Sequence, residues 1–295
     1  MIKVGLIDVD GHNAFPNLAL MKLSAYHKQK GDSVEFANAM FQNYDIVYKS
    51  KVFTFTPDNN EIYNCEVIKA GTGYKDYSTN LNYDIEHICP DYDLYNSNIA
   101  YGFLTRGCIN KCEWCIVPDK EGKIKANADI EEFISNKKQA ILLDNNVLAS
   151  AHGLLQIEKI IRLRIRVDFN QGLDVRLAYS DKYILDLLSK VKWTRQIRFA
   201  CDTLSQLDPL IKVTEELMKK GIKPYRIFVY VLIKKDTNDA LIILNKLKEI
   251  GVVPFAQPYR DFDNKIKPTR EQKDLARWCN HKAIFNSIDF SRYKN

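Results

Sequence analysis

Long hydrophobic segments are absent from this chain of 295 residues. No apolar run approaches the roughly 18 residues that a membrane-spanning helix needs. Residues 1–8 are typical of a buried strand that ends in an acid, and they lack the charged start, apolar middle and small-residue cleavage site of a signal peptide. We therefore expect a cytoplasmic protein with no membrane partner.

The sequence also has little that suggests disulfide bonds or disorder. Seven cysteines, an odd number, are better explained by metal binding, catalysis or burial than by a disulfide framework. Hydrophobic residues make up 46% of the chain, which is enough to bury a sizeable core and excludes disorder as the main state. The length suggests one large domain or two ordinary ones.

A large excess of one charge is missing as well. The chain carries 43 Lys and Arg against 37 Asp and Glu, a net charge of +6 that excludes a histone-like nucleic-acid binder. Residues 1–100 hold 8 basic and 13 acidic residues, net −5, and the rest of the chain holds 35 and 24, net +11. This asymmetry indicates two units with different partners.

The first part of the chain alternates strand and helix patterns. β-branched and aromatic runs predict strands over residues 3–9, 33–37, 46–55 and 66–70, and apolar spacing predicts a helix over residues 17–30. Strands separated by helices favour parallel pairing, so residues 1–80 are predicted to form a small Rossmann-like α/β domain. A stretch poor in aliphatic residues follows, and we interpret residues 81–99 as a linker.

The alternation becomes more regular after residue 100. Strands are predicted over residues 100–105, 140–143, 166–169, 197–200, 226–233 and 252–256, at the spacing of βα units. Asp208 is expected to cap a helix that starts at Pro209, and Gly221 and Gly251 are expected at helix ends. We predict an α/β fold with a partial (β/α)6 TIM-like barrel over residues 100–265, active at its strand ends, and a helical tail over residues 266–295.

The strongest motif lies directly after the first of these six strands. Cys108, Cys112 and Cys115 have the spacing Cys-x3-Cys-x2-Cys. Three thiolates can hold a four-iron cluster and leave one iron open to a small molecule. Zinc is the competing metal, but a structural zinc site needs four ligands and no His or Cys follows at suitable spacing.

The segment from Arg106 to Cys115, with Trp114 before the third cysteine, resembles the cluster loop of the radical S-adenosylmethionine (SAM) enzymes. The resemblance implies that the three cysteines hold a [4Fe-4S] cluster whose open iron binds SAM. One electron from an external donor such as flavodoxin or ferredoxin would then cleave SAM to a 5′-deoxyadenosyl radical, which abstracts hydrogen from a substrate.

The resemblance also extends to polar residues at later strand ends. It implies contacts to the amino group, carboxylate or ribose of SAM from residues that match the family's motifs only in part, since the glycines of the second-strand turn are missing. Ordinary helix capping and strand-end solvation are equally good explanations for any one of them. The cofactor-binding candidates are Trp114, Asp144, Asn145, Gln171, Asp174, Arg176 and Asp202.

In residues 15–26 and 30–35 the first domain resembles the cobalamin-binding-like domains that precede the barrel in one branch of this superfamily, and residues 90–92 resemble the linker of that branch. Asp10 and His12 follow its first strand as in the cobalt-ligating motif, but Phe15 replaces the glycine. Gly71 and Gly73 are candidates for a turn near a cofactor's tail. We interpret the domain as vestigial, do not expect it to bind cobalamin, and treat His12 as a candidate substrate contact. A cobalamin-dependent radical SAM methyltransferase is the alternative.

The basic second half suggests an anionic substrate, such as a nucleotide, a nucleic-acid base or a peptide. Solvation of outer helices by lysines explains the excess equally well. Tyr259 and Arg260, which follow the sixth predicted strand, are the candidate substrate contacts. A non-catalytic iron–sulfur or zinc protein remains open as a different class of function. The other four cysteines are expected to be bystanders: Cys65, Cys89, Cys201 and Cys279.

Overall fold

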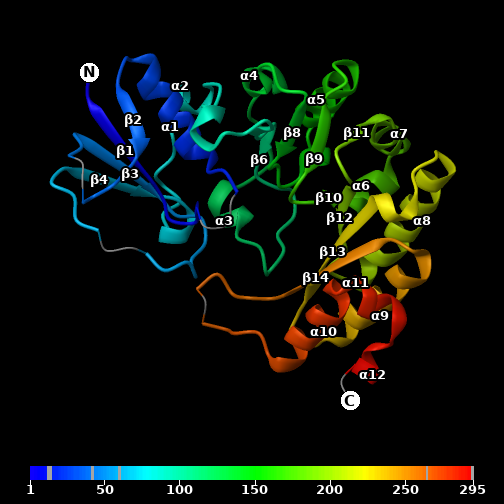
Figure 1. Ribbon diagram of the computed structural model, residues 1–295. Coiled ribbons are helices and arrows are strands. Elements are labelled where there is room, and N and C mark those ends of the chain that lie inside the picture. Colours follow the sequence, from blue (N-terminus) through cyan, green and yellow to red (C-terminus); the bar gives the residue numbers. More distant parts are fainter. Residues whose placement is uncertain (12–14, 41–42, 59–60, 264, 294–295) are drawn as a thin grey trace. The chain divides into compact units, whose positions relative to one another are not determined.

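The computed structural model describes residues 1–11, 15–40, 43–58, 61–263 and 265–293. Its contacts divide the chain into two compact units. The first comprises Met1–Gly102 and Ala128–Gln139, and the second comprises Phe103–Asn127 and Ala140–Asn295. Both units are α/β, with sheets built largely from parallel strands (Figure 1).

Four parallel strands form the sheet of the first unit, in the order β2-β1-β3-β4. They are β1 (Lys3–Asp8), β2 (Ser33–Phe36), β3 (Ile46–Ser50) and β4 (Glu66–Ala70). Helix α1 (Leu18–Gln29) packs against this sheet, and Asn17 caps it by accepting a hydrogen bond from the Leu20 N–H. Because side chains alternate along a strand, the sheet buries apolar residues on both faces, with Leu6 in one cluster and Ile7 in the other.

The predicted linker is folded onto the first unit. It contains helix α2 (Tyr83–Glu86) and the short 3-10 helix η3 (Tyr92–Tyr95). Asp91 accepts hydrogen bonds from Ser24 and Lys28 of α1, and the buried Tyr92 donates one to the carbonyl of Phe133. This stretch has few aliphatic residues, and these polar and aromatic side chains make the contacts that attach it to the first unit. The unit is completed by η2 (Thr72–Tyr74), β5 (Ala100–Gly102) and α4 (Ile130–Ile134).

The second unit holds the remaining strands. One sheet has the order β10 (Leu173–Asp174), β12 (Ile197–Ala200), β13 (Ile227–Ile233) and β14 (Val253–Pro258), all parallel. In another, β11 (Lys192–Trp193), β9 (Arg166–Phe169) and β8 (Gln139–Leu142) lie side by side. The short strands β6 (Thr105–Arg106) and β7 (Lys125–Ala126) form an antiparallel pair. Within the described residues no sheet closes into a barrel.

Helices separate these strands and cover the buried faces of the sheets. They are α3 (Val117–Glu121), η4 (Val147–Ala149), α5 (Ala151–Arg162), α6 (Val175–Ser180), α7 (Lys182–Lys190), η5 (Leu204–Gln206), α8 (Leu207–Lys219), η6 (Pro224–Arg226) and α9 (Asn238–Ile250). The tail folds as α10 (Arg270–Asn280), α11 (Lys282–Ser287) and α12 (Phe290–Tyr293). None of the helices in the described part of the chain is long and apolar enough to cross a membrane.

Strand β13 shows why the sheet has two different faces. Its residues alternate strictly, and Val229 and Val231 are fully buried, while Phe228 and Tyr230 on the opposite face are half-buried. Helix α9 packs against β13 and β14. The outer edge of β14 is closed by α10, because the amide of Asn280 bonds both the N–H and the carbonyl of Ala256.

The predicted start of α8 is wrong. The helix begins at Leu207 and not at Pro209, and its N-cap residue is Gln206 and not Asp208. The preceding residues form η5, in which Thr203 and Gln206 make a reciprocal capping box. That turn satisfies the first N–H groups, so Asp208 is left inside the first turn of the helix. Gly221 and Gly251 have the positive φ expected of residues at helix ends.

Candidate site around the cysteine loop

The cysteine loop, residues 107–116, joins β6 to α3 within the second unit. Gly107 begins it with φ of +81°, and a Cβ there would lie 2.3 Å from the carbonyl oxygen of Lys123. The Cys108 N–H donates a hydrogen bond of 3.2 Å to the carbonyl of Gly122. The backbone at Gly107 and the backbone at Lys123 therefore approach so closely that only glycine fits at position 107.

Glu121 fastens the start of this loop. Its carboxylate accepts hydrogen bonds from the Arg106 guanidinium at 3.1 Å and from the Gly107 N–H at 2.9 Å. A third bond of 2.9 Å comes from the side-chain amide of Asn145. The predicted SAM contact Asn145 is thus engaged with the base of the cysteine loop.

Asp144 holds the strand that enters the loop. Its carboxylate is buried and accepts hydrogen bonds from the N–H groups of Leu104 and Thr105, at 3.2 and 2.6 Å, and from the Thr105 hydroxyl at 2.7 Å. Burial raises the pKa of Asp144 to about 6, although these bonds oppose the rise. These three hydrogen bonds tie Asp144 to Thr105 of β6 and to Leu104, the residue before that strand.

Asn146 is a site residue that the sequence did not single out. Its amide donates to the Cys108 sulfur at 3.4 Å, and the Asn110 N–H donates to the same sulfur at 3.3 Å. Its own side-chain oxygen is buried without a hydrogen-bond partner. Two N–H donors on one sulfur are the environment that suits a metal-bound thiolate, because such bonds stabilise negative charge on sulfur. Its position after Asp144 and Asn145 is the only signal in the sequence that pointed to it.

The three loop cysteines are free and partly exposed. Burial raises the pKa of Cys112 and of Cys115, and negative charge on Cys108 raises both further. Their mutual influence is consistent with a set of three neighbouring thiols that a bound cation would stabilise. In the described parts of the chain, however, no three His, Cys, Asp or Glu side chains converge as a metal-binding group. The donor chemistry therefore fits an iron–sulfur cluster, while the arrangement of the sulfurs does not itself form a metal site.

Asp174 connects the loop to the end of β10. It accepts a hydrogen bond of 2.9 Å from the Asn110 side chain and two from its neighbour Arg176, at 2.9 and 2.7 Å. Although burial raises it, the bonds from Arg176 and Asn110 hold the pKa of Asp174 below its ordinary value. Two of the predicted cofactor contacts, Asp174 and Arg176, are thus brought together beside the loop.

The end of β13 also meets the loop. The Lys234 ammonium lies 3.9 Å from the ring centroid of Trp114, a cation–π contact. Asp202, which follows β12, accepts a hydrogen bond of 2.9 Å from the Leu232 N–H, and burial raises the pKa of its carboxyl. The loop is therefore held over the carboxyl ends of strands in one parallel sheet, where α/β proteins place their sites.

The contacts described above do not include Gln171, Tyr259 or Arg260. Gln171 is exposed in the turn before β10, and Tyr259 and Arg260 follow β14, where the Tyr259 N–H donates to the carbonyl of Ile233. His12 lies outside the described residues. Cys201 and Cys279 are buried, which raises the pKa of each thiol to about 12, and Cys65 and Cys89 are half-buried.

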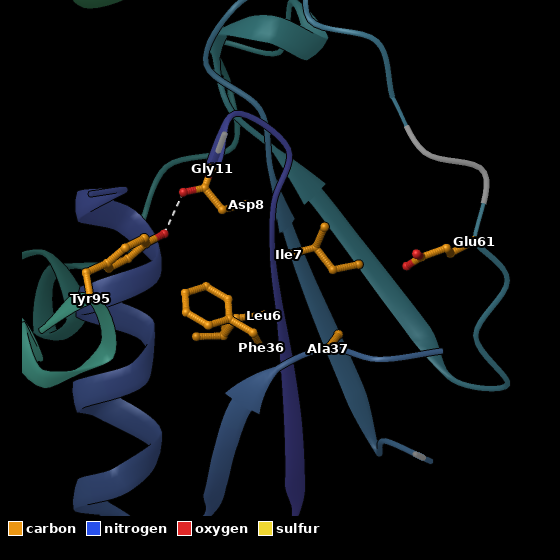
Figure 2. Close-up of a pocket in the computed structure, with 8 residues that line it drawn as sticks. All are labelled: Leu6, Ile7, Asp8, Gly11, Phe36, Ala37, Glu61 and Tyr95. Carbon is orange, nitrogen blue, oxygen red and sulfur yellow. Dashed lines mark hydrogen bonds between the residues drawn. The ribbon is translucent and has the colours of Figure 1, made fainter. Parts of the chain in front are cut away.

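The first unit has a cavity of its own, of about 410 Å³, at the carboxyl ends of β1 and β2 (Figure 2). The Tyr95 hydroxyl donates a hydrogen bond of 2.6 Å to Asp8, and burial raises the pKa of that carboxyl. Gly71, a candidate for a turn near a cofactor's tail, lies against another segment of backbone. A Cβ on it would lie 2.3 Å from the carbonyl oxygen of Lys51, so this glycine permits two backbone segments to pack together. Besides Asp8 and Tyr95, the cavity at the ends of β1 and β2 is lined by Leu6, Ile7, Gly11, Phe36, Ala37 and Glu61.

Comparisons with known proteins do not assign the chain to a family. No family model matches it, and no curated protein matches it significantly.

Proposed function

We propose that this chain is a radical SAM enzyme in which Cys108, Cys112 and Cys115 hold a [4Fe-4S] cluster. The observation that carries the proposal is the position of the cysteine loop, which contacts Asp174 and Lys234 at the carboxyl ends of β10 and β13. In this proposal the βα units after residue 100 make up a partial TIM-like barrel, with the cluster at its strand ends.

The surrounding residues have defined parts in the proposal. Glu121 and Asp144 hold the backbone that enters the loop, and Asn146 directs an N–H at the Cys108 sulfur. Arg176, oriented by Asp174, presents a guanidinium suited to the carboxylate of SAM. When bound, the cluster would supply the electron that cleaves SAM to a 5′-deoxyadenosyl radical, which takes hydrogen from the substrate.

The test is anaerobic reconstitution of the full chain with iron and sulfide, followed by reduction with dithionite in the presence of SAM. We expect about four irons per chain and the formation of 5′-deoxyadenosine, measured by mass spectrometry. Replacing any loop cysteine with alanine should abolish both. Cys65→Ala and Cys89→Ala, in the first unit, are the matched controls and should change neither.

Other outcomes identify the alternatives. A full cluster without 5′-deoxyadenosine would replace the proposal with a non-catalytic iron–sulfur protein, and stoichiometric zinc in place of iron would indicate a zinc protein. Stoichiometric cobalamin binding at micromolar concentration would indicate a cobalamin-dependent methyltransferase. About eight irons per chain would show that some of the other four cysteines are ligands.

A further inference from the structure

An aromatic surface lies on the sheet face opposite to the fully buried one in the second unit. Phe228, Tyr230 and Phe255, here called the aromatic platform, have ring centroids 5.1 to 6.1 Å apart. Phe228 and Phe255 are stacked at 24°, and Phe255 remains 38% exposed. Tyr230 meets both phenylalanine rings edge-on, at 79° and 88°, so the exposed ring of Phe255 is the surface that suits a planar ligand.

The platform is rigidly held. Arg198 bonds both carboxylate oxygens of Asp168, at 2.6 and 2.8 Å, and its guanidinium lies 4.9 Å from the ring centroid of Phe228. The Tyr230 hydroxyl accepts a bond from Arg198 and donates one of 2.9 Å to the carbonyl of Asn170. Because these protein side chains are already ordered, the binding of a stacked ligand costs little of their conformational entropy.

Strand register places the platform in the same row as a residue of the candidate site. Asp174 pairs with Ala200, Ala200 with Tyr230, and Tyr230 with Phe255. Adjacent strands lie about 4.8 Å apart, so the platform begins roughly 10 Å from Asp174, the residue that contacts the cysteine loop. A substrate on this face would lie within reach of chemistry at the loop.

A hydrogen-bonding group stands next to the rings. Gln257 lies two residues after Phe255 on the same face, is exposed, and its amide has no hydrogen-bond partner among the residues that the structure describes. An amide can both donate to and accept from the edge of a base that stacks on the platform. The second unit also carries 33 Lys and Arg against 21 Asp and Glu, a net charge of +12 that favours a phosphate-bearing ligand.

A peptide fits this surface less well. Peptides commonly bind a sheet by adding a strand to its edge, but Asn280 of α10 occupies the edge of β14 at Ala256. What the face offers is the exposed ring of Phe255 with an amide beside it, and both match a nucleobase better than a peptide backbone.

We propose that the substrate is a nucleotide or a single-stranded nucleic acid whose base stacks on Phe255 and has its edge bound by Gln257. This inference rests on the proposed function, since it assigns the substrate of the same site. It is tested by equilibrium binding of the anaerobic holoprotein with SAM and without reductant. The probes are nucleoside monophosphates, single-stranded RNA and DNA of about twelve nucleotides, and an abasic oligonucleotide of the same length.

We expect base-bearing probes to bind at least about tenfold more tightly than the abasic one, because each stacked base contributes to affinity. Phe255→Leu should remove most of that difference in affinity. Gln257→Ala should also weaken binding, and by different amounts for different bases. Tyr225→Leu, which removes an aromatic that is 61% exposed on η6, is the matched control and should bind like the wild type. Tighter binding of oligonucleotides than of monophosphates would identify the source as nucleic acid, and equal binding would identify it as a free nucleotide.

Equal affinity for abasic and base-bearing probes, wild-type affinity in Phe255→Leu and Gln257→Ala, or no binding of any probe would overturn the inference. Circular dichroism establishes that each variant is folded, and Phe255→Leu keeps an apolar side chain against Phe228 to preserve the core. Because binding is measured without reductant, it is independent of SAM cleavage. A protein that cleaves SAM but binds no nucleotide refutes only this inference, and the reverse result refutes only the proposed function.

Discussion

A single buried carboxylate, Asp144, supports the strand that leads into the cysteine loop. Its folded pKa of about 6 lies above the ordinary value of about 3.9, so the folded state holds its proton more tightly than the unfolded chain does. The stability that this group contributes is therefore fully present below about pH 4 and is lost as the pH rises through 6. The shift corresponds to about 3 kcal/mol across that window.

We predict that Asp144→Asn removes this pH dependence. The variant loses hydrogen bonds to Leu104 and Thr105 and should be less stable than the wild type at pH 4.5, by about 2 to 4 kcal/mol. The gap should narrow by about 2 to 3 kcal/mol by pH 7.5, because only the wild type must then bury a charge. Urea unfolding at a series of pH values measures both quantities.

Asp208→Asn is the control for that experiment. Asp208 is exposed and pairs with Lys212 one turn away on α8, so its removal should leave the pH profile of stability like that of the wild type. Parallel profiles for the wild type and Asp144→Asn would show that Asp144 does not titrate in the way its burial implies.

Among the connecting elements, the turn at Gly107 is the most constrained part of the cysteine loop. Both Gly107 and Gly122 have positive φ, +81° and +71°, so alanine is strained at either position. They differ in space, since a Cβ at 107 would lie 2.3 Å from the Lys123 carbonyl oxygen, and at 122 nothing lies within 4 Å. We predict that Gly107→Ala displaces the loop, and that it lowers both cluster content and thermal stability well beyond Gly122→Ala.

The two variants are compared by iron content after reconstitution and by melting temperature. Gly122→Ala should cost about 1 to 3 kcal/mol, because φ of +71° with ψ of −146° is a backbone conformation that glycine adopts far more readily than alanine, and the variant should retain its iron. If both variants held iron equally and melted together, the close approach at Gly107 would not matter for the site.

Whether the sequence predicts a strand and its bounds depends on the length of that strand and on the elements with which it pairs. The strands over residues 66–70, 166–169 and 197–200 have the predicted bounds, because each is a short run with the β-branched and aromatic residues typical of strands. The two-residue strands β7, β10 and β11 were missed, since two residues have no periodicity. A partial barrel stays a prediction, because closure depends on how sheets meet and not on local pattern.

The candidate site shows the same division. The spacing of the three cysteines and the polar strand ends mark its position, and the pairing of Asp174 with Arg176 is local in sequence. Glu121 and Asn146 escaped notice because their partners are distant: Glu121 bonds Asn145, and Asn146 bonds Cys108. Sequence patterns hold no signal for contacts between individual side chains this far apart in the chain, because tertiary packing alone decides them.

The whole molecule is divided in a way that the chain order hides. Residues 128–139 belong to the first unit although the second unit precedes and follows them. Their helix, α4, is held there by the bond from the Tyr92 hydroxyl to the Phe133 carbonyl and by the pair between His87 and Glu132 at 2.6 Å. If the units unfold as separate cooperative bodies, α4 should lose protection together with the first unit.

We predict that Leu20→Ala exposes this coupling in native-state hydrogen exchange. Leu20 is 1% exposed in the core of the first unit, and its truncation should cost about 2 to 5 kcal/mol. Exchange should accelerate in β1, β3 and α4, while amides of β13 keep their wild-type rates. Leu244→Ala, at a fully buried position of α9, is the reciprocal control and should accelerate β13 and leave α4 unchanged. Exchange in α4 that followed Leu244→Ala instead would place that helix in the cooperative unit of the cysteine loop.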